Sequence, residues 1–145
     1  MKRRVIAASV GGVAIAAASL GTAFALPSHP SNRTWTFMFV ANQTAQHVYT
    51  SQAVFGDKEV SAGKVIGTDT LQCKFTSKTT ADCVVAASYK GGQIYGEFTQ
   101  DFKTGKLSGK VTGGNRLYKD ASGTITGHAL SGTQTKVTVN FQTPL

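Results

Sequence analysis

From residue 34 onward, apolar and polar positions alternate with a period of two in short runs separated by glycine-rich turns. Such alternation is typical of half-buried β-strands, and no window shows the 3.6-residue apolar period of an amphipathic helix. Turn signals return about every dozen residues, which favours an all-β sandwich or barrel. The expected strands are 34–41, 64–76, 82–89, 93–100, 107–112, 123–130 and 135–141, with a further strand pair or a bulged edge strand around 54–60. About eight strands suffice for a barrel that closes around side chains or one small ligand.

The period of two also assigns strand faces. In 107–112 the apolar positions Leu107 and Val111 oppose polar ones, and 135–141 shows the same pattern. The apolar sets are expected to point inward. Across the two strands that carry the cysteines, one shared face is expected to hold Asp69, Leu71, Cys73, Phe75, Cys83, Val85 and Ala87.

The first expected strand is apolar on both faces. Trp35, Phe37 and Phe39 lie on one face, and Met38 and Val40 lie on the other. A strand of this kind needs cover on both sides, which a monomeric barrel does not provide. We therefore expect a homo-oligomer.

The first 25 residues have the order of a secretory signal peptide. Three basic residues at 2–4 precede an uncharged run from Val5 to Phe24, and 23–25 supplies a small-x-small cleavage pattern. A membrane anchor is the alternative, because a run of about 20 residues can span a bilayer. The many alanines and glycines and the cleavage pattern favour export instead. We expect a secreted protein without stable membrane anchoring after cleavage, with a flexible leader at 26–33 and one barrel domain at 34–145.

Charge adds little to this description. The formal net charge is +8, but the lysines after the signal peptide are scattered singly. A nucleic-acid surface would cluster them on one element with interleaved aromatic residues. The basic balance therefore indicates a solvated exterior, and we expect no nucleic-acid partner.

The two cysteines, Cys73 and Cys83, fall in adjacent expected strands. In an exported protein this indicates one disulfide, and a hairpin turning near 77–79 would place the pair directly opposite each other. A metal pair is the alternative. Two thiols without two further nearby ligands fall short of a zinc site, so no metal is expected.

Residues 111–127 form a glycine-rich corner between two strand-like segments. A Gly-Gly turn followed by an aromatic residue and another strand is typical of a barrel corner, since glycine within strands marks bends and close backbone approaches. The residues expected to build this corner are Gly113, Gly114, Tyr118 and Gly123.

The corner resembles that of the allene oxide cyclase and dirigent superfamily, in its bacterial secreted branch. The family pattern is Thr-Gly-Gly-Thr/Ser-Gly-x-aromatic-x-Gly-Ala-x-Gly. It holds here at Thr112, Gly113, Gly114, Tyr118, Ala121 and Gly123, and departs at Arg116 and Asp120, where glycine is usual. A left-handed residue other than glycine costs about 1–2 kcal/mol, which leaves another turn shape open. Segments 37–42 and 64–69 also resemble the family.

This resemblance implies an eight-stranded antiparallel barrel, often trimeric, with a central hydrophobic cavity. It also implies a cofactor-free cyclase, isomerase or stereo-guiding protein that works by holding a small hydrophobic molecule in a productive shape. Plant cyclases carry a cavity-facing glutamate where this chain has Val40, so plant-type allene oxide cyclisation is not expected. The neighbouring family asparagine matches at Asn42.

The register taken from the resemblance points Met38, Val40 and Asn42 inward and the first-strand aromatic residues outward. The predicted cavity residues are then Met38, Val40, Asn42, Asp69, Leu71, Phe75 and Val85. Asn42 and Asp69 are the candidate catalytic residues, because an Asp in an apolar cavity has a raised pKa and can act as an acid. The alternatives are a solvated Asp69 at the barrel rim and, for the whole protein, a non-catalytic secreted binding or structural module.

Overall fold

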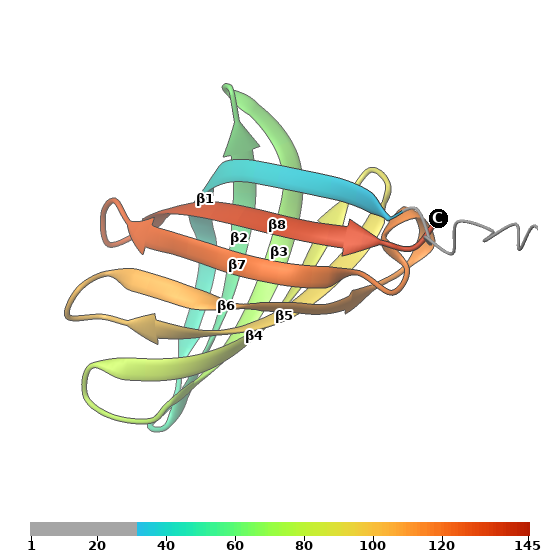
Figure 1. Ribbon diagram of the computed structural model, residues 1–145. Helices are drawn as coiled ribbons and strands as arrows, with labels where there is room; N and C mark the ends of the chain where they lie inside the picture. The colour runs from blue at the N-terminus through green and yellow to red at the C-terminus, as the bar shows by residue number, and fades with distance from the viewer. Residues whose placement is uncertain (1–31) are drawn as a thin grey trace, which may run out of the picture.

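The computed structural model describes residues 32–145, so the predicted signal peptide and most of the predicted leader lie outside the described residues. Eight strands follow one another around a closed barrel, each antiparallel to the next, and the last strand pairs with the first (Figure 1). This confirms the predicted fold class. The elements are β1 (Arg33–Val48), β2 (Gln52–Ser61), β3 (Lys64–Phe75), β4 (Thr80–Tyr89), β5 (Gly92–Asp101), β6 (Lys106–Gly114), the 3-10 helix η1 (Arg116–Tyr118), β7 (Ser122–Ala129) and β8 (Gln134–Thr143). Within residues 32–145, no helix is long and apolar enough to cross a membrane.

Strands β3 to β8 begin and end within two residues of the predicted bounds, whereas β1 and β2 differ. β1 continues through a polar segment to Val48, and its register shifts between Gln43 and Ala45. The Thr44 hydroxyl donates a hydrogen bond to the Gly56 carbonyl at 2.8 Å there. β2 is one continuous strand paired on both sides, not a strand pair or an edge.

The predicted inward face of β1 is wrong. Phe39 and Ala41 point into the barrel and are each 6% exposed, whereas Met38 is 60% exposed on the outside. Trp35 and Phe37 pack against the buried core. The aromatic face of β1 therefore lies inside the barrel, and the apolar residues that this strand leaves on the outside are Met38 and Val40. The homo-oligomer, inferred from the two apolar faces of this strand, stays a prediction.

An aromatic cluster fills the end of the barrel where β1 begins. The ring of Tyr118, carried by η1, lies edge-on to Trp35 at 5.3 Å, to Phe141 at 5.7 Å and to Phe37 at 5.9 Å between centroids. Tyr89 joins the cluster, with its ring 4.7 Å from that of Phe37. Edge-to-face pairs of this kind add about 0.5–1.5 kcal/mol each beyond the burial of their area. This aromatic cluster (Trp35, Phe37, Tyr89, Tyr118 and Phe141) closes one end of the barrel.

The glycine-rich corner holds Tyr118 in that position. A Cβ atom on Gly114 would collide with the Tyr118 carbonyl oxygen. Arg116 and Asp120, the two departures from the family pattern, have φ angles of 50° and 56°. The turn therefore keeps a left-handed shape at both positions although neither residue is glycine.

The Cys73–Cys83 disulfide joins directly opposite residues of β3 and β4, which confirms the predicted pairing. A disulfide of this kind fits an oxidising compartment.

Relief of the left-handed strain at the corner is measurable. We expect Arg116→Gly to raise the free energy of unfolding by about 0.5–1 kcal/mol, because about 1–2 kcal/mol of backbone strain is removed and part of that is lost to the greater freedom of glycine. Urea unfolding followed by Trp35 fluorescence measures the change.

The matched control is Lys119→Gly, at an exposed position whose φ of −53° carries no such strain. It is expected to be neutral or destabilising. An equal gain in both variants would contradict the strain at Arg116.

Candidate functional site: a barrel cavity with three buried carboxyls

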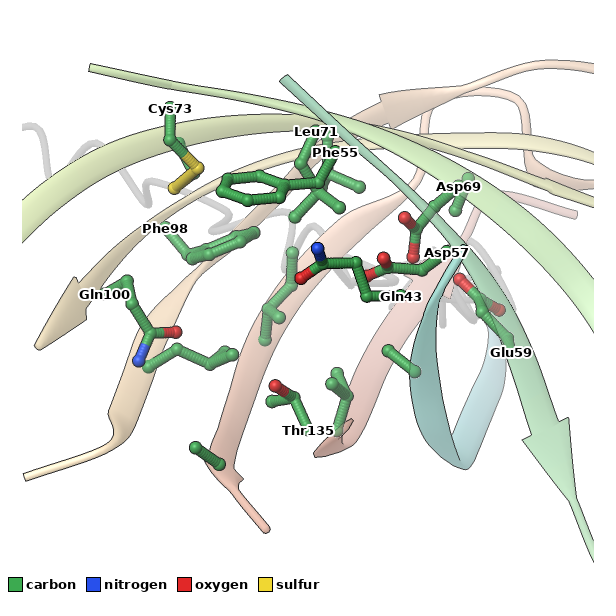
Figure 2. Close-up of a pocket in the computed structure, with 18 of the residues that line it drawn as sticks. Gln43, Phe55, Asp57, Glu59, Asp69, Leu71, Cys73, Phe98, Gln100 and Thr135 are labelled. Carbon is green, nitrogen blue, oxygen red and sulfur yellow. A yellow bond between two sulfur atoms is a disulfide. The ribbon is translucent and has the colours of Figure 1, made fainter. Parts of the chain in front are cut away.

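A cavity of about 610 Å³ occupies the barrel interior, which is the size of a site for a small organic molecule. It extends from Tyr89, beside the aromatic cluster, to the hairpin residues Phe102, Ser131 and Gly132 at the opposite end, here called the mouth. Most of its wall is apolar, and Figure 2 shows part of this lining. Apolar and aromatic wall residues include Phe39, Phe55, Leu71, Phe75, Val85, Ile94, Phe98, Leu107, Ile125, Val137 and Val139.

The registers of β2, β3 and β4 arrange the polar part of the wall in rows. Antiparallel pairing places inward residues of neighbouring strands side by side, and successive rows are two residues apart along each strand. From the aromatic cluster toward the mouth the rows are Glu59–Gly67–Tyr89, Asp57–Asp69–Ala87, Phe55–Leu71–Val85 and Ala53–Cys73–Cys83. The acidic side chains therefore lie deep in the cavity, and the disulfide lies nearer the mouth.

Gly67 makes room for the innermost row. A Cβ atom there would lie 2.7 Å from Cδ1 of Tyr89, so the Tyr89 ring can lie over β3 only because this position is glycine. The ring then brings its hydroxyl to the Glu59 carboxyl across the row.

Three carboxyl groups converge at this depth (Figure 2). Asp57 and Asp69 face each other across β2 and β3, and Glu59, in the next row, is 1% exposed. Each has one buried oxygen without a hydrogen-bond partner: Oδ1 of Asp57, Oε2 of Glu59 and Oδ1 of Asp69. Gln43 is the β1 partner of Asp57, but its amide donates to Oε1 of Gln46 at 2.6 Å instead. The carboxyl cluster, Asp57, Glu59 and Asp69, is thus left partly unsatisfied.

No basic side chain offsets the carboxyl cluster. The residues that line the cavity include no Lys, Arg or His. Within residues 32–145 one ion pair is present, between Lys110 and Glu97 on the outer face, with a distance of 3.0 Å between Nζ and Oε1. The described residues also contain no group of three or more His, Cys, Asp or Glu side chains arranged to hold a metal ion.

Burial is the main cause of the unusual proton affinity of these groups. It raises the pKa of Glu59 to about 9, with the nearby charges of Asp69 and Asp57 adding to the effect and the Tyr89 hydroxyl opposing it. Burial, then the charge of Asp57, raises the pKa of Asp69 to about 6, while a hydrogen bond with Glu59 lowers it. Burial also raises the pKa of Asp57. Near neutral pH, Glu59 therefore keeps its proton while Asp69 is mostly ionised.

The structure divides the predicted cavity residues into two groups. Asp69, Leu71, Phe75 and Val85 line the cavity, and Met38, Val40 and Asn42 do not.

Asn42 lies on the other face of β1, where its amide donates to the Val40 carbonyl at 3.1 Å and its Oδ1 accepts from Gln134 at 2.8 Å. Asn42 and Asp69 are therefore not brought together. The comparison of Val40 with a cavity-facing glutamate also loses its basis, because Val40 points away from the cavity.

Asp57, Glu59 and Tyr89 were missed as site residues. A signal was present in β2, where Asp57 and Glu59 continue the face of Ala53 and Phe55. The other face of β2, with Val54 and Val60, is equally apolar, so alternation alone does not choose between them.

Comparisons with known proteins bear on the fold. No protein-family model and no curated protein sequence matches this chain. Among solved structures, the chain is similar to pyocyanin demethylase, with a TM-score of 0.62 and 21% sequence identity over 75% of this chain and 99% of that one. At this level of identity the likeness shows a shared eight-stranded barrel fold.

The carboxyl cluster predicts an unusual dependence of stability on pH. Because the folded-state pKa of Glu59 is raised from 4.5 to about 9, the folded protein binds an extra proton between these values. Stability is then lost as pH rises through this window, by up to about 1.4 kcal/mol per pH unit for one group. Glu59→Gln, which mimics the protonated form, is expected to exceed the natural protein in stability by at least about 2 kcal/mol at pH 8, with the difference shrinking toward pH 5.

Chemical unfolding from pH 5 to 8 measures this difference. Glu97→Gln, on the exposed outer face, is the control and is expected to show no such trend. Parallel stability curves for Glu59→Gln and the natural protein would contradict a buried, protonated Glu59.

Proposed function

We propose that this barrel binds a small lipophilic molecule in its central cavity and holds one polar group of that molecule against the carboxyl cluster. The observation that carries this proposal is an apolar cavity of about 610 Å³ with three partnerless carboxyl oxygens deep inside it. A buried polar atom without a partner costs about 1–3 kcal/mol, and such atoms in natural proteins call for a specific explanation. A bound ligand that donates hydrogen bonds would remove this cost.

Several features support the wider setting of the proposal. The signal-peptide pattern at 1–25 and the disulfide support a secreted protein. The corner pattern and the barrel support membership of the allene oxide cyclase and dirigent superfamily, and with it a trimer. The similar solved structure is named as a demethylase of pyocyanin, which supports the view that a barrel of this fold can carry catalysis.

A second candidate is cofactor-free acid–base catalysis, such as an isomerisation or cyclisation of the bound molecule. It is favoured by the two different proton affinities within the carboxyl cluster, a pattern typical of paired acid and base groups. The Asp69 carboxylate would accept a proton from one atom of the substrate, and protonated Glu59 would donate one to another. Transfer of the accepted proton from Asp69 to the neighbouring Glu59 would then restore both groups.

Turnover of the natural ligand by both Asp69→Asn and Glu59→Gln at the natural rate would exclude this second candidate. Native mass spectrometry of the protein from its own culture medium is the way to obtain that ligand. A mass that is released on denaturation would identify its chemical class.

Cavity binding itself is tested with N-phenyl-1-naphthylamine, a neutral lipophilic dye whose emission rises in apolar sites. We expect saturable binding, and we expect Val85→Trp to weaken it at least tenfold because the indole would occupy the cavity beside Leu71. Val84→Trp is the matched control, since Val84 is adjacent on β4 but 54% exposed on the outer face.

Circular dichroism checks that each variant folds. If Val85→Trp does not fold, Ala129→Trp at the more tolerant mouth obstructs the same cavity. Equal dye binding by the inner and outer variants would refute a ligand site inside the barrel.

A further inference from the structure

The charged side chains that line the cavity all carry the same sign. Asp57 and Glu59 point into the cavity, whereas Lys58, between them on β2, is exposed on the outside. Every cavity-lining residue that carries a formal charge is acidic. A ligand at the deep end therefore meets negative charge and hydrogen-bond acceptors with no basic side chain to pair with an anion.

An acidic lining without basic side chains disfavours most lipophilic ligands. A fatty acid or another anion would place like charges together in a cavity that screens them poorly. A neutral molecule without N–H or O–H groups would leave the partnerless oxygens as they are. Glu59 makes this mismatch costly, because its unpartnered oxygen belongs to a side chain that is 1% exposed.

Building on the proposed function, we infer that the ligand is an organic cation: an apolar, ring-sized body that carries an amidinium, guanidinium or protonated amine group. Two parallel N–H groups of such a head would meet Asp57 and Asp69, which face each other across β2 and β3. Charge-assisted pairs of this geometry are the strongest hydrogen bonds of their kind. The row nearer the mouth, Phe55–Leu71–Val85, would then contact the apolar body.

The cationic head also couples binding to protons. The titratable groups that face the head are Asp57 and Glu59 of β2, Asp69 of β3 and Tyr89 of β4, while the facing polar residues of β1 and β8, Gln43 and Thr135, are neutral. A cation favours the ionised forms of the carboxyls, so its binding is expected to release protons near neutral pH. Affinity is accordingly expected to fall as pH is lowered from 8 to 5.

Three isosteric probes isolate the charge of the head. Biphenyl-4-carboxamidine is a cation, biphenyl-4-carboxamide is neutral and biphenyl-4-carboxylate is an anion, and all three share one apolar body. In calorimetric titrations at pH 7.5 we expect the amidine to bind at least tenfold more tightly than the amide, and the carboxylate to bind most weakly. Repeating the amidine titration in buffers of different ionisation enthalpy counts the protons released.

Variants assign the preference to the carboxyl cluster. The near-isosteric Asp57→Asn/Glu59→Gln/Asp69→Asn variant is expected to lower amidine affinity to that of the amide. If the triple variant does not fold, the single Asp57→Asn variant is expected to reduce the preference severalfold. Asp82→Asn is the control, because Asp82 is exposed on the outer face of β4, where it accepts a hydrogen bond from Thr99.

The possible outcomes separate this inference from the proposed function. An amide that binds as tightly as the amidine, or an equal loss of amidine affinity in Asp82→Asn, overturns the inference and leaves cavity binding in place. If none of the three probes binds while N-phenyl-1-naphthylamine does, the inference falls alone. If the dye also fails to bind, the proposed function falls with it.

Discussion

Closure of the sheet between β1 and β8 is the constraint on which the rest of this molecule depends. An eight-stranded barrel removes both sheet edges and leaves an interior that side chains can just fill. Here the filling is uneven. The aromatic cluster fills the end where β1 begins. The remainder is lined by several Phe residues but also by small ones such as Ala41, Ala87 and Gly96, and it stays hollow.

The boundary between the filled and hollow parts lies at the row Glu59–Gly67–Tyr89. Tyr89 belongs to both parts, since its ring packs on Phe37 while its hydroxyl reaches Glu59. A buried carboxyl at such a position lowers stability at neutral pH, and the neighbouring Asp57–Asp69 row is where the head of the proposed ligand would bind. The aromatic packing and the disulfide stabilise the barrel from either side of this costly region.

The strands from β3 to β8 could be predicted because most of them alternate apolar and polar positions, and because polar or glycine-containing turns separate them. The disulfide followed from the same alternation. The inward face of β1 could not be predicted in this way, because both of its faces carry apolar residues such as Phe39 and Val40. Which face of it is covered depends on contacts with Tyr118 and Phe141, about a hundred residues away in the chain.

The carboxyl cluster could not be predicted from the sequence for a related reason. Asp69 was a candidate from its own strand, but its meeting with Asp57 depends on the register between β2 and β3. That register shifts between Glu59 and Val60, beside a hairpin with no strong turn motif. A one-residue slip of β2 would have turned Asp57 to solvent and left Asp69 in the cavity, so their convergence is a property of strand pairing and not of any local motif.

The aromatic cluster at the end of the barrel has one more consequence. Because it seals the far end, a molecule that enters at the mouth travels toward a fixed floor and leaves by the way it came. The proposed cationic ligand would enter with its charged head first. The distance from the Asp57–Asp69 row to the mouth would then set how much of its apolar body lies inside the cavity. The depth of the cavity would therefore select ligands by length as well as by charge, because the aromatic cluster around Tyr118 limits how far a ligand can enter.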